Sequence, residues 1–173
     1  MISCMEFIHA YSELFRFLHE RYGRAAVGRF WEGISDRFLT NLRDHVGRKG
    51  MEGMYEYWTH TLTEERGDWE MELRCGGHRR LLKCHGDQPV AETRTGGEPW
   101  AEGPDAVFQI RMHACPSVAK LRRATHMKPY ASYCEHCDAL YRRVIEPFGY
   151  TYEIAYLDPD KGACRLTVKP KAP

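Results

Sequence analysis

The sequence lacks the segments that send a protein to a membrane or out of the cell. It has no run of about 18 apolar residues, and the N-terminal MISCMEFIHAYSELF has no basic leader followed by an apolar stretch and a cleavage site. The sequence also has no large excess of positive or negative charge, because 25 Lys and Arg residues nearly balance 24 Asp and Glu residues and leave a formal net charge of +1. We therefore expect a soluble, cytoplasmic protein that binds a small-molecule ligand or substrate and neither nucleic acid nor membrane.

The sequence also lacks the signs of a disulfide scaffold. Its seven cysteines are an odd number, and a chain of 173 residues is long enough to bury a core without covalent cross-links. In a reducing compartment, such cysteines indicate free thiols, metal ligands or catalytic groups. Each cysteine therefore needs its own interpretation.

The first part of the chain, residues 1–66, has the pattern of a helical region. Apolar residues recur at spacings of three and four over Cys4–Tyr22, Arg24–Val46 and Met51–Glu65. Gly23 and the segment GRKG (47–50) mark the ends of the first two helices. The apolar faces of these helices can pack on a core or equally form a homodimer interface.

From residue 67 the pattern changes to strands. Residues alternate between apolar and polar in WEMELRC (69–75) and AVFQIRMHA (106–114), and two strands near the C-terminus, YTYEIAYL and ACRLTV, are joined by the turn DPDKG. Residues 76–104 are rich in Gly, Pro and charge, and only RLLKCH (80–85) looks like a strand there, so we predict a long loop.

Two further helices are expected between the strands. Pro116 begins PSVAKLRRA, with proline at its favoured first position, and a longer helix is predicted from Tyr130 to Pro147. The sequence therefore predicts a single α+β domain over residues 1–173. It combines the N-terminal helices with an antiparallel sheet of about four strands and two helices in 67–168, followed by a frayed tail at 169–173.

Two thiols, a histidine and two carboxylates crowd into YCEHCD, residues 133–138. On the predicted helix, where each residue turns about 100°, Cys134, Cys137 and Tyr141 fall on one stripe with Asp138 at its edge. His136 lies on roughly the opposite side from Cys134, so His136 and Glu135 are predicted to lie outside the site. The motif reduces to a CxxC pair with a neighbouring carboxylate.

Three interpretations of the pair are open. Free cysteines are among the most often buried residues, so both can be core residues. A redox pair sits at the start of a helix, whereas this pair is predicted to lie well inside one. A metal site needs more ligands, and MHACPS supplies His113 and Cys115 at the end of a strand.

The candidate metal ligands are therefore Cys115, Cys134, Cys137 and His113, with Zn²⁺ or Fe as the metal and no nucleotide cofactor expected. Cys75, Cys84 and Cys164 stay unassigned. Substrate-binding candidates are three tyrosines near the thiols, whose hydroxyls can orient a polar ligand, and an arginine that can anchor a carboxylate: Tyr130, Tyr133, Tyr141 and Arg111.

The segments CPSVAKL, YCEHCDALY and GACRLTV, in this order, give the chain a family resemblance over about Phe108–Val168. It resembles the L-2-amino-thiazoline-4-carboxylic acid hydrolase-like family and, more distantly, vinyl-reductase-type small-ligand-binding domains. The chain departs from the family pattern in its long insertion at 76–104 and in lacking Gly-Asp before the last cysteine.

The resemblance implies hydrolysis of a cyclic isothiourea, in which water adds to the ring carbon between sulfur and nitrogen. It implies Asp138 as the base and Cys115, Cys134 and Cys137 as metal ligands or nucleophile, and motif position adds Cys164. The alternatives are a non-catalytic small-ligand or metal sensor domain of the same fold and a structural domain held together by a metal.

Overall fold

The helices come first in the chain and the sheet follows, in a computed structural model that describes residues 4–65, 67–86, 88–96 and 100–172. Within these ranges the elements are α1 (Cys4–Tyr22), α2 (Arg24–Phe38), α3 (Thr40–Glu65), β1 (Gly67–Cys75), β2 (His78–Gly86), β3 (Ala91–Thr95), β4 (Val107–Ala114), α4 (Pro116–Arg123), α5 (Glu135–Ile145), the short 3₁₀ helix η1 (Glu146–Phe148), β5 (Tyr150–Asp158) and β6 (Ala163–Pro170). The predicted α+β class is confirmed. None of the helices in these ranges is long and apolar enough to cross a membrane.

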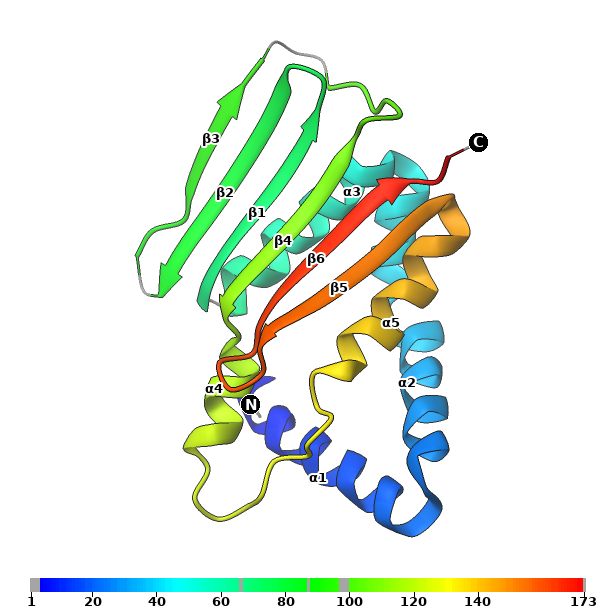
Figure 1. The fold of residues 1–173 in the computed structure, drawn as a ribbon, viewed down its shortest axis with the longest axis vertical. Coiled ribbons are helices and arrows are strands. Elements are labelled where there is room, and N and C mark those ends of the chain that lie inside the picture. The colour runs from blue at the N-terminus through cyan, green and yellow to red at the C-terminus, as the bar shows by residue number, and fades with distance from the viewer. Residues whose placement is uncertain (1–3, 66, 87, 97–99, 173) are drawn as a thin grey trace.

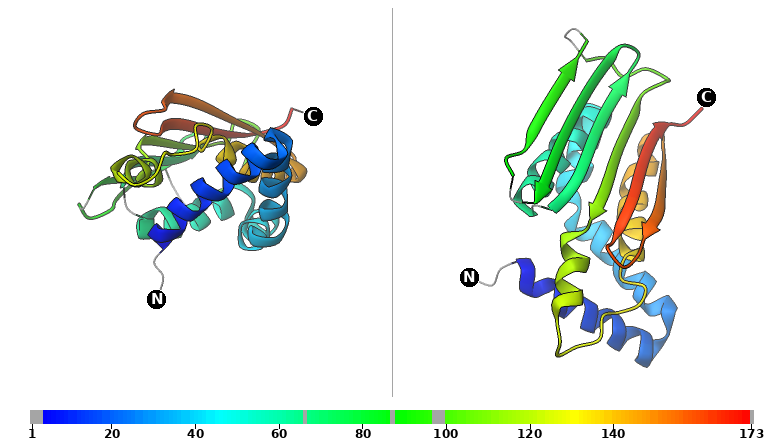
Figure 2. Two further views of the ribbon diagram at one scale, coloured as in Figure 1. Left: turned by 90° about the horizontal axis from the view of Figure 1, so that it is seen from below. Right: turned by 60° about the vertical axis from the view of Figure 1, so that its left-hand side comes forward.

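All the strands belong to one antiparallel sheet, in the order β3-β2-β1-β4-β6-β5. Helices α3 and α5 pack on one face of this sheet, whereas α1 and α4 lie beyond its lower end (Figure 1). The view from below in Figure 2 shows α1, α2 and α3 on one side of the strands. The start of α5 therefore lies where the sheet, α4 and the N-terminal helices meet.

Two hydrophobic clusters hold these layers together. The larger one lies between the sheet and α3 and α5, and alternate residues of β1 (Trp69, Met71 and Leu73) are fully buried in it. This alternation is the period-two pattern predicted for the strand. The smaller cluster joins α1, α2, α4 and the start of α5 and contains Phe15, Val27, Trp31, Leu121, Tyr130, Tyr133 and Leu140.

The sheet has six strands and not about four, because residues 76–104, predicted as a long loop, contribute β2 and β3. The strand-like segment RLLKCH (80–85) lies in β2, whereas β3 had no predicted counterpart. All five residues of β3 are exposed. An edge strand without a buried face has no alternation of apolar and polar residues, so its sequence carries no strand signal.

The predicted helix over Arg24–Val46 is divided between α2 and α3. The break comes at Leu39 (φ −87°, ψ 28°). The predicted boundary at residue 50 corresponds to a kink within α3, where Gly50 has φ 56° and ψ −131°. Glycine adopts a positive φ without the steric penalty of a Cβ, so the kink falls at the residue that tolerates it best.

Glu102 fixes the kink from outside the helix. Its Oε2 atom accepts a hydrogen bond of 2.9 Å from the Met51 amide, and its carboxylate also accepts a hydrogen bond from the Tyr150 hydroxyl. A carboxylate bonded to a backbone N–H at a helix start is a charge-assisted cap. Glu102 thereby joins the connection after β3 to α3 and β5.

We expect the Glu102→Gln substitution to lower the free energy of unfolding by about 1–2 kcal/mol, because the charge-assisted hydrogen bonds become neutral ones. Urea unfolding followed by tryptophan fluorescence measures the change. The exposed Glu153 of β5 provides the control, since Glu153→Gln should leave the midpoint unchanged. Equal midpoints for both variants would contradict the capping role.

Candidate functional site

The CxxC pair lies at the start of α5. Cys134 is the N-cap residue (φ −64°, ψ −22°), and its carbonyl accepts a 3.2 Å hydrogen bond from the Cys137 amide. The residues before it form turns, in which the Tyr133 amide bonds to the Tyr130 carbonyl over 3.1 Å. The prediction of a helix from Tyr130, with the pair well inside it, is wrong.

Contacts with α1 hold this segment in place before the helix begins. The Tyr130 amide donates a 2.9 Å hydrogen bond to Ser12 Oγ, and Ser12 is fully buried. The Tyr130 hydroxyl lies 3.1 Å from His19 Nδ1. The rings of Tyr130 and Tyr133 both pack against Phe15. These long-range contacts override the helical periodicity of the segment.

Ser12→Ala should therefore loosen the segment before α5. The buried Tyr130 amide loses its partner, which we expect to lower the unfolding free energy by about 1–3 kcal/mol and to speed alkylation of Cys134. The matched control is Ser35→Ala, because Ser35 is also fully buried but donates to the Leu140 carbonyl inside α5. It should lower stability without exposing Cys134. Alkylation of Cys134 at equal rates in both variants would refute the anchoring role of Ser12.

Two tyrosines of β5 bind the backbone of the cysteine pair. The Tyr152 hydroxyl donates to the Cys137 carbonyl over 3.4 Å, and the Tyr156 hydroxyl donates to the Cys134 carbonyl over 3.3 Å. The two tyrosines are four residues apart on one strand, so they share a face of the sheet. The sheet thereby positions both cysteines.

Four thiols converge near the start of α5. Cys115 is the N-cap residue of α4, and Cys164 lies on β6 opposite Tyr156. Burial is the main cause that raises the pKa of Cys134 to about 11 and those of Cys137 and Cys164 to about 12. For Cys134 and Cys164 the neighbouring thiols raise the pKa further. The pKa of Cys115 is also raised by burial, although amides at the start of α4 favour its thiolate. These cysteines are therefore protonated at neutral pH.

His113 and Arg111 do not join the thiols. On β4 the residues Phe108 and Ile110 point into the core, and alternation directs His113 and Arg111 to the other face of the sheet, where both act electrostatically on Glu70. In the described ranges, no three His, Cys, Asp or Glu side chains are arranged to hold a metal ion. Of the predicted ligand set, Cys115, Cys134 and Cys137 lie near enough to affect one another electrostatically, as does Cys164, but they do not form a ready metal site, and His113 is left out.

His136, which the helical pattern placed outside the site, contacts Cys137. Its Nε2 atom lies 3.5 Å from Cys137 Sγ, and its Nδ1 atom hydrogen-bonds to the Tyr133 carbonyl. Because a carbonyl only accepts, we assign the proton to Nδ1, which leaves the Nε2 lone pair facing the thiol. Burial lowers the pKa of His136 and keeps the ring neutral. The ring packs against Phe15 and Trp31.

Glu65, the exposed last residue of α3, acts on this group through its charge. Partial desolvation raises the pKa of its carboxyl, whereas the charges of Lys120 and His136 lower it. The Glu65 charge also raises the pKa of Cys137 and of Cys115. Sequence reasoning named Glu65 only as the end of a predicted helix and gave no signal for a role in the site.

Asp138, the predicted base, is held in an ion pair. Arg142 donates to its Oδ1 atom from Nη2 over 2.7 Å and from Nε over 3.1 Å, and Arg142 also binds Glu146 over 2.8 Å. The side chains of Asp138 and Arg142 are 37% and 41% exposed. Asp138 is thus engaged on the outer part of α5.

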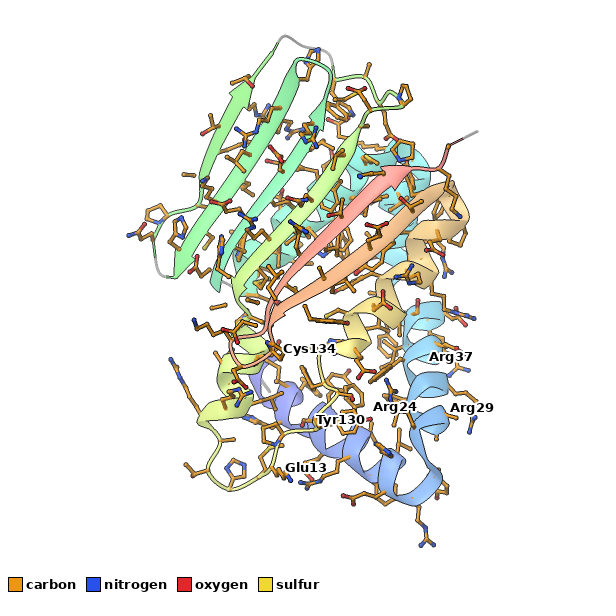
Figure 3. The ribbon with its side chains drawn as sticks, in the orientation of Figure 1. Glu13, Arg24, Arg29, Arg37, Tyr130 and Cys134 are labelled. Carbon is orange, nitrogen blue, oxygen red and sulfur yellow. The ribbon has the colours of Figure 1, made fainter. Side chains whose placement is uncertain are left out.

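A pocket of about 460 Å³ opens beside Cys134. Its walls come from α4, the segment 128–135 and the turn between β5 and β6, and Tyr130 and Tyr133 are among its lining residues. Figure 3 shows Cys134 where the start of α5 meets the lower end of the sheet, with Tyr130 on the side of α1. Tyr141, the third predicted tyrosine, instead packs against Trp58 in the core, with ring centroids 5.2 Å apart.

Comparisons with known proteins yield no relative: no protein-family model, curated protein or solved structure matches the chain significantly. The resemblance to thiazoline hydrolases therefore rests on the motifs CPSVAKL, YCEHCDALY and GACRLTV alone. The chemistry of the site has to be argued from its geometry.

Proposed function

We propose that the protein is a small hydrolase that acts on a carbon bonded to nitrogen or sulfur, as in a cyclic isothiourea or amidine. The observation that carries the proposal is the pair formed by Cys137 Sγ and His136 Nε2 at 3.5 Å, with His136 oriented by the Tyr133 carbonyl. A thiol next to a base that a third group orients is the arrangement of nucleophilic catalysis. The adjacent pocket offers room for a small ligand.

In this proposal His136 removes the proton from Cys137 as the sulfur attacks the isothiourea carbon. The bond from this carbon to the ring sulfur breaks, and the ring sulfur takes the proton from His136. A water molecule then adds to the same carbon, and the bond to Cys137 breaks, which restores the thiol and releases a carbamoyl product. One water molecule is consumed per turnover.

Glu65 has an electrostatic role in this scheme. Its charge raises the pKa of His136, so it favours the imidazolium that forms when Cys137 loses its proton. In Ser-His-Asp sites a carboxylate that is hydrogen-bonded to the histidine stabilises the imidazolium, whereas here His136 Nδ1 is bonded to the Tyr133 carbonyl and Glu65 acts through its charge alone. The neutral thiol and imidazole of the resting site become an ion pair only during attack.

The test is direct detection of turnover and of the covalent intermediate. The reduced protein is incubated with 2-amino-thiazoline-4-carboxylate and with open-chain isothioureas, and product thiol and carbamoyl compound are quantified. Acid quenching and peptide mass spectrometry should then find the adduct on Cys137. Absence of both turnover and adduct in fully reduced protein would refute the proposal.

Asp138→Asn separates this scheme from the one that the motif implies. We expect turnover to change by less than a few-fold, because Asp138 is already bound to Arg142, and stability to fall by only about 0.3–0.5 kcal/mol, as for other i,i+4 ion pairs. Steady-state kinetics of the purified variant measure the effect. A loss of turnover much larger than the loss of affinity would restore Asp138 as the base.

A second candidate is a non-catalytic sensor that binds a metal through thiolates. The mutual electrostatic effects of the Cys115, Cys134, Cys137 and Cys164 thiols favour it. Because no three of these side chains are arranged to hold a metal ion in the described residues, binding of Zn²⁺ or another thiophilic ion would require them to rearrange and to lose their protons. The experiment is elemental analysis of protein purified without chelator, paired with a thiol titration. One equivalent of metal with masked thiols supports the sensor, and metal-free protein with every thiol reactive contradicts it.

A further inference from the structure

We propose that Cys134 and Cys137 form a reversible disulfide at the start of α5. The two residues are the first and last of a four-residue turn closed by the 3.2 Å hydrogen bond from the Cys137 amide to the Cys134 carbonyl. Because Cys134 has helical backbone angles and the two residues between the cysteines begin α5, helix geometry places the two Cα atoms about 5 Å apart, within the range of about 4.4–6.8 Å that disulfides usually span. The bond can therefore form with little movement of the backbone.

The two thiols differ in access, as the partners of a redox pair do. Cys134 is the N-cap residue and lines the pocket, where a small reagent can reach it. Cys137 lies one turn deeper, beside His136. Paired thiols at a helix start, with the outer one accessible, are the arrangement of dithiol redox sites.

The other two thiols of the cluster are less suited to pairing. Cys115 belongs to α4, and its amide is bonded to the Lys161 carbonyl over 3.0 Å. Its Cβ atom is so close to Gly162 that a Cβ added there would lie only 2.6 Å away. Cys164 is held in the ladders between β6 and both of its neighbours. A disulfide from Cys115 or Cys164 to a cysteine at the start of α5 would link two elements that are each held in place by their own contacts.

The oxidant is a low-molecular-weight disulfide, and the reaction is thiol–disulfide exchange. The Cys134 sulfur attacks one sulfur of the reagent, forms a mixed disulfide and expels one reagent thiolate. Cys137 passes its proton to His136 and attacks the Cys134 sulfur, which forms the protein disulfide and expels the second thiolate. Two protein thiols are oxidised, one reagent disulfide is reduced, and the two protons end on the released thiols.

The disulfide is compatible with the surroundings of the pair. The half-buried site opposes charge on sulfur, and both the protonated thiols of the reduced pair and the disulfide are uncharged. Oxidation also removes the thiol that the proposed hydrolysis needs. This consequence, and only this one, rests on the proposed function.

The experiment equilibrates the native chain in glutathione buffers of graded reduced-to-oxidised ratio, quenches with acid, alkylates free thiols and maps them by peptide mass spectrometry. We expect Cys134 and Cys137 to lose alkylation together, in one two-electron transition, with their shared peptide lighter by two hydrogen atoms. Cys164→Ser should leave the transition unchanged, and Cys134→Ser should abolish it.

Two outcomes overturn the inference. One is alkylation of both cysteines at the most oxidising ratio, and the other is a disulfide from Cys137 to Cys115 or Cys164. The result is separable from the proposed function, because hydrolysis is assayed only in reduced protein. A disulfide without hydrolysis leaves this inference standing and removes the hydrolase, whereas hydrolysis without a disulfide does the reverse.

Discussion

Cys137→Ala is expected to reduce hydrolysis of 2-amino-thiazoline-4-carboxylate by about 10⁴-fold or more, the usual consequence of removing a catalytic nucleophile. The variant lacks the sulfur that faces His136 at 3.5 Å, so no covalent adduct can form. KM should change less than kcat, since the substitution leaves the residues that line the pocket in place. The measurement is kcat and KM for the reduced protein, with adduct detection by mass spectrometry.

Two further variants identify the reason for the loss. Cys164→Ala removes a thiol of the same cluster that has no described contact with His136 and should retain turnover within a few-fold. His136→Gln keeps the nucleophile but removes its base, so kcat should fall by about 100-fold at similar KM. If Cys137→Ala turned over substrate at the parent rate, the nucleophile assignment would be wrong even if the protein proved to be a hydrolase.

Much of the fold was predictable because its elements have buried faces. The bounds of α1 follow from apolar residues at helical spacing, and β1 follows from the alternation of Trp69, Met71 and Leu73. The start of α5 was not predictable, because a hydrogen bond to Ser12, more than a hundred residues away, decides it. Helical periodicity does not report which residues of a periodic segment other elements hold in turns.

The site was predictable in part for related reasons. The CxxC motif and Cys115 were found by residue type and spacing, whereas Cys164 joins them through strand register, which the sequence of β6 alone does not specify. The position of His113 could have been found, since the inward Phe108 and Ile110 predict that odd-numbered residues of β4 face outward. The contact between His136 and Cys137 could not have been predicted, because a helical wheel gives the direction of Cβ and not the side-chain rotamer that brings the imidazole onto Cys137.

Gly53→Ala is expected to destabilise the protein by about 3 kcal/mol or more, as overpacking against an immovable neighbour does. The kink at Gly50 turns the second part of α3 against the first. A Cβ added at Gly53 would lie 2.0 Å from the His45 carbonyl oxygen and 2.5 Å from its carbon. These atoms are backbone, so no side-chain rotation relieves the clash and the two parts of α3 have to separate.

The control is a helical glycine without neighbours. Gly28 lies inside α2 with no atom within 4 Å of an added Cβ, so Gly28→Ala should stabilise the protein by about 0.5–1 kcal/mol through helix propensity. Urea unfolding of both variants compares them. The two substitutions are chemically identical. If Gly53→Ala lowers and Gly28→Ala raises the free energy of unfolding, the effect at Gly53 comes from the close approach to His45. If both variants are more stable, α3 does not fold back at the kink. Glu65 is the last residue of the same helix. Separation of the two parts should therefore also move its charge relative to His136 and slow the proposed hydrolysis in whatever fraction of Gly53→Ala remains folded.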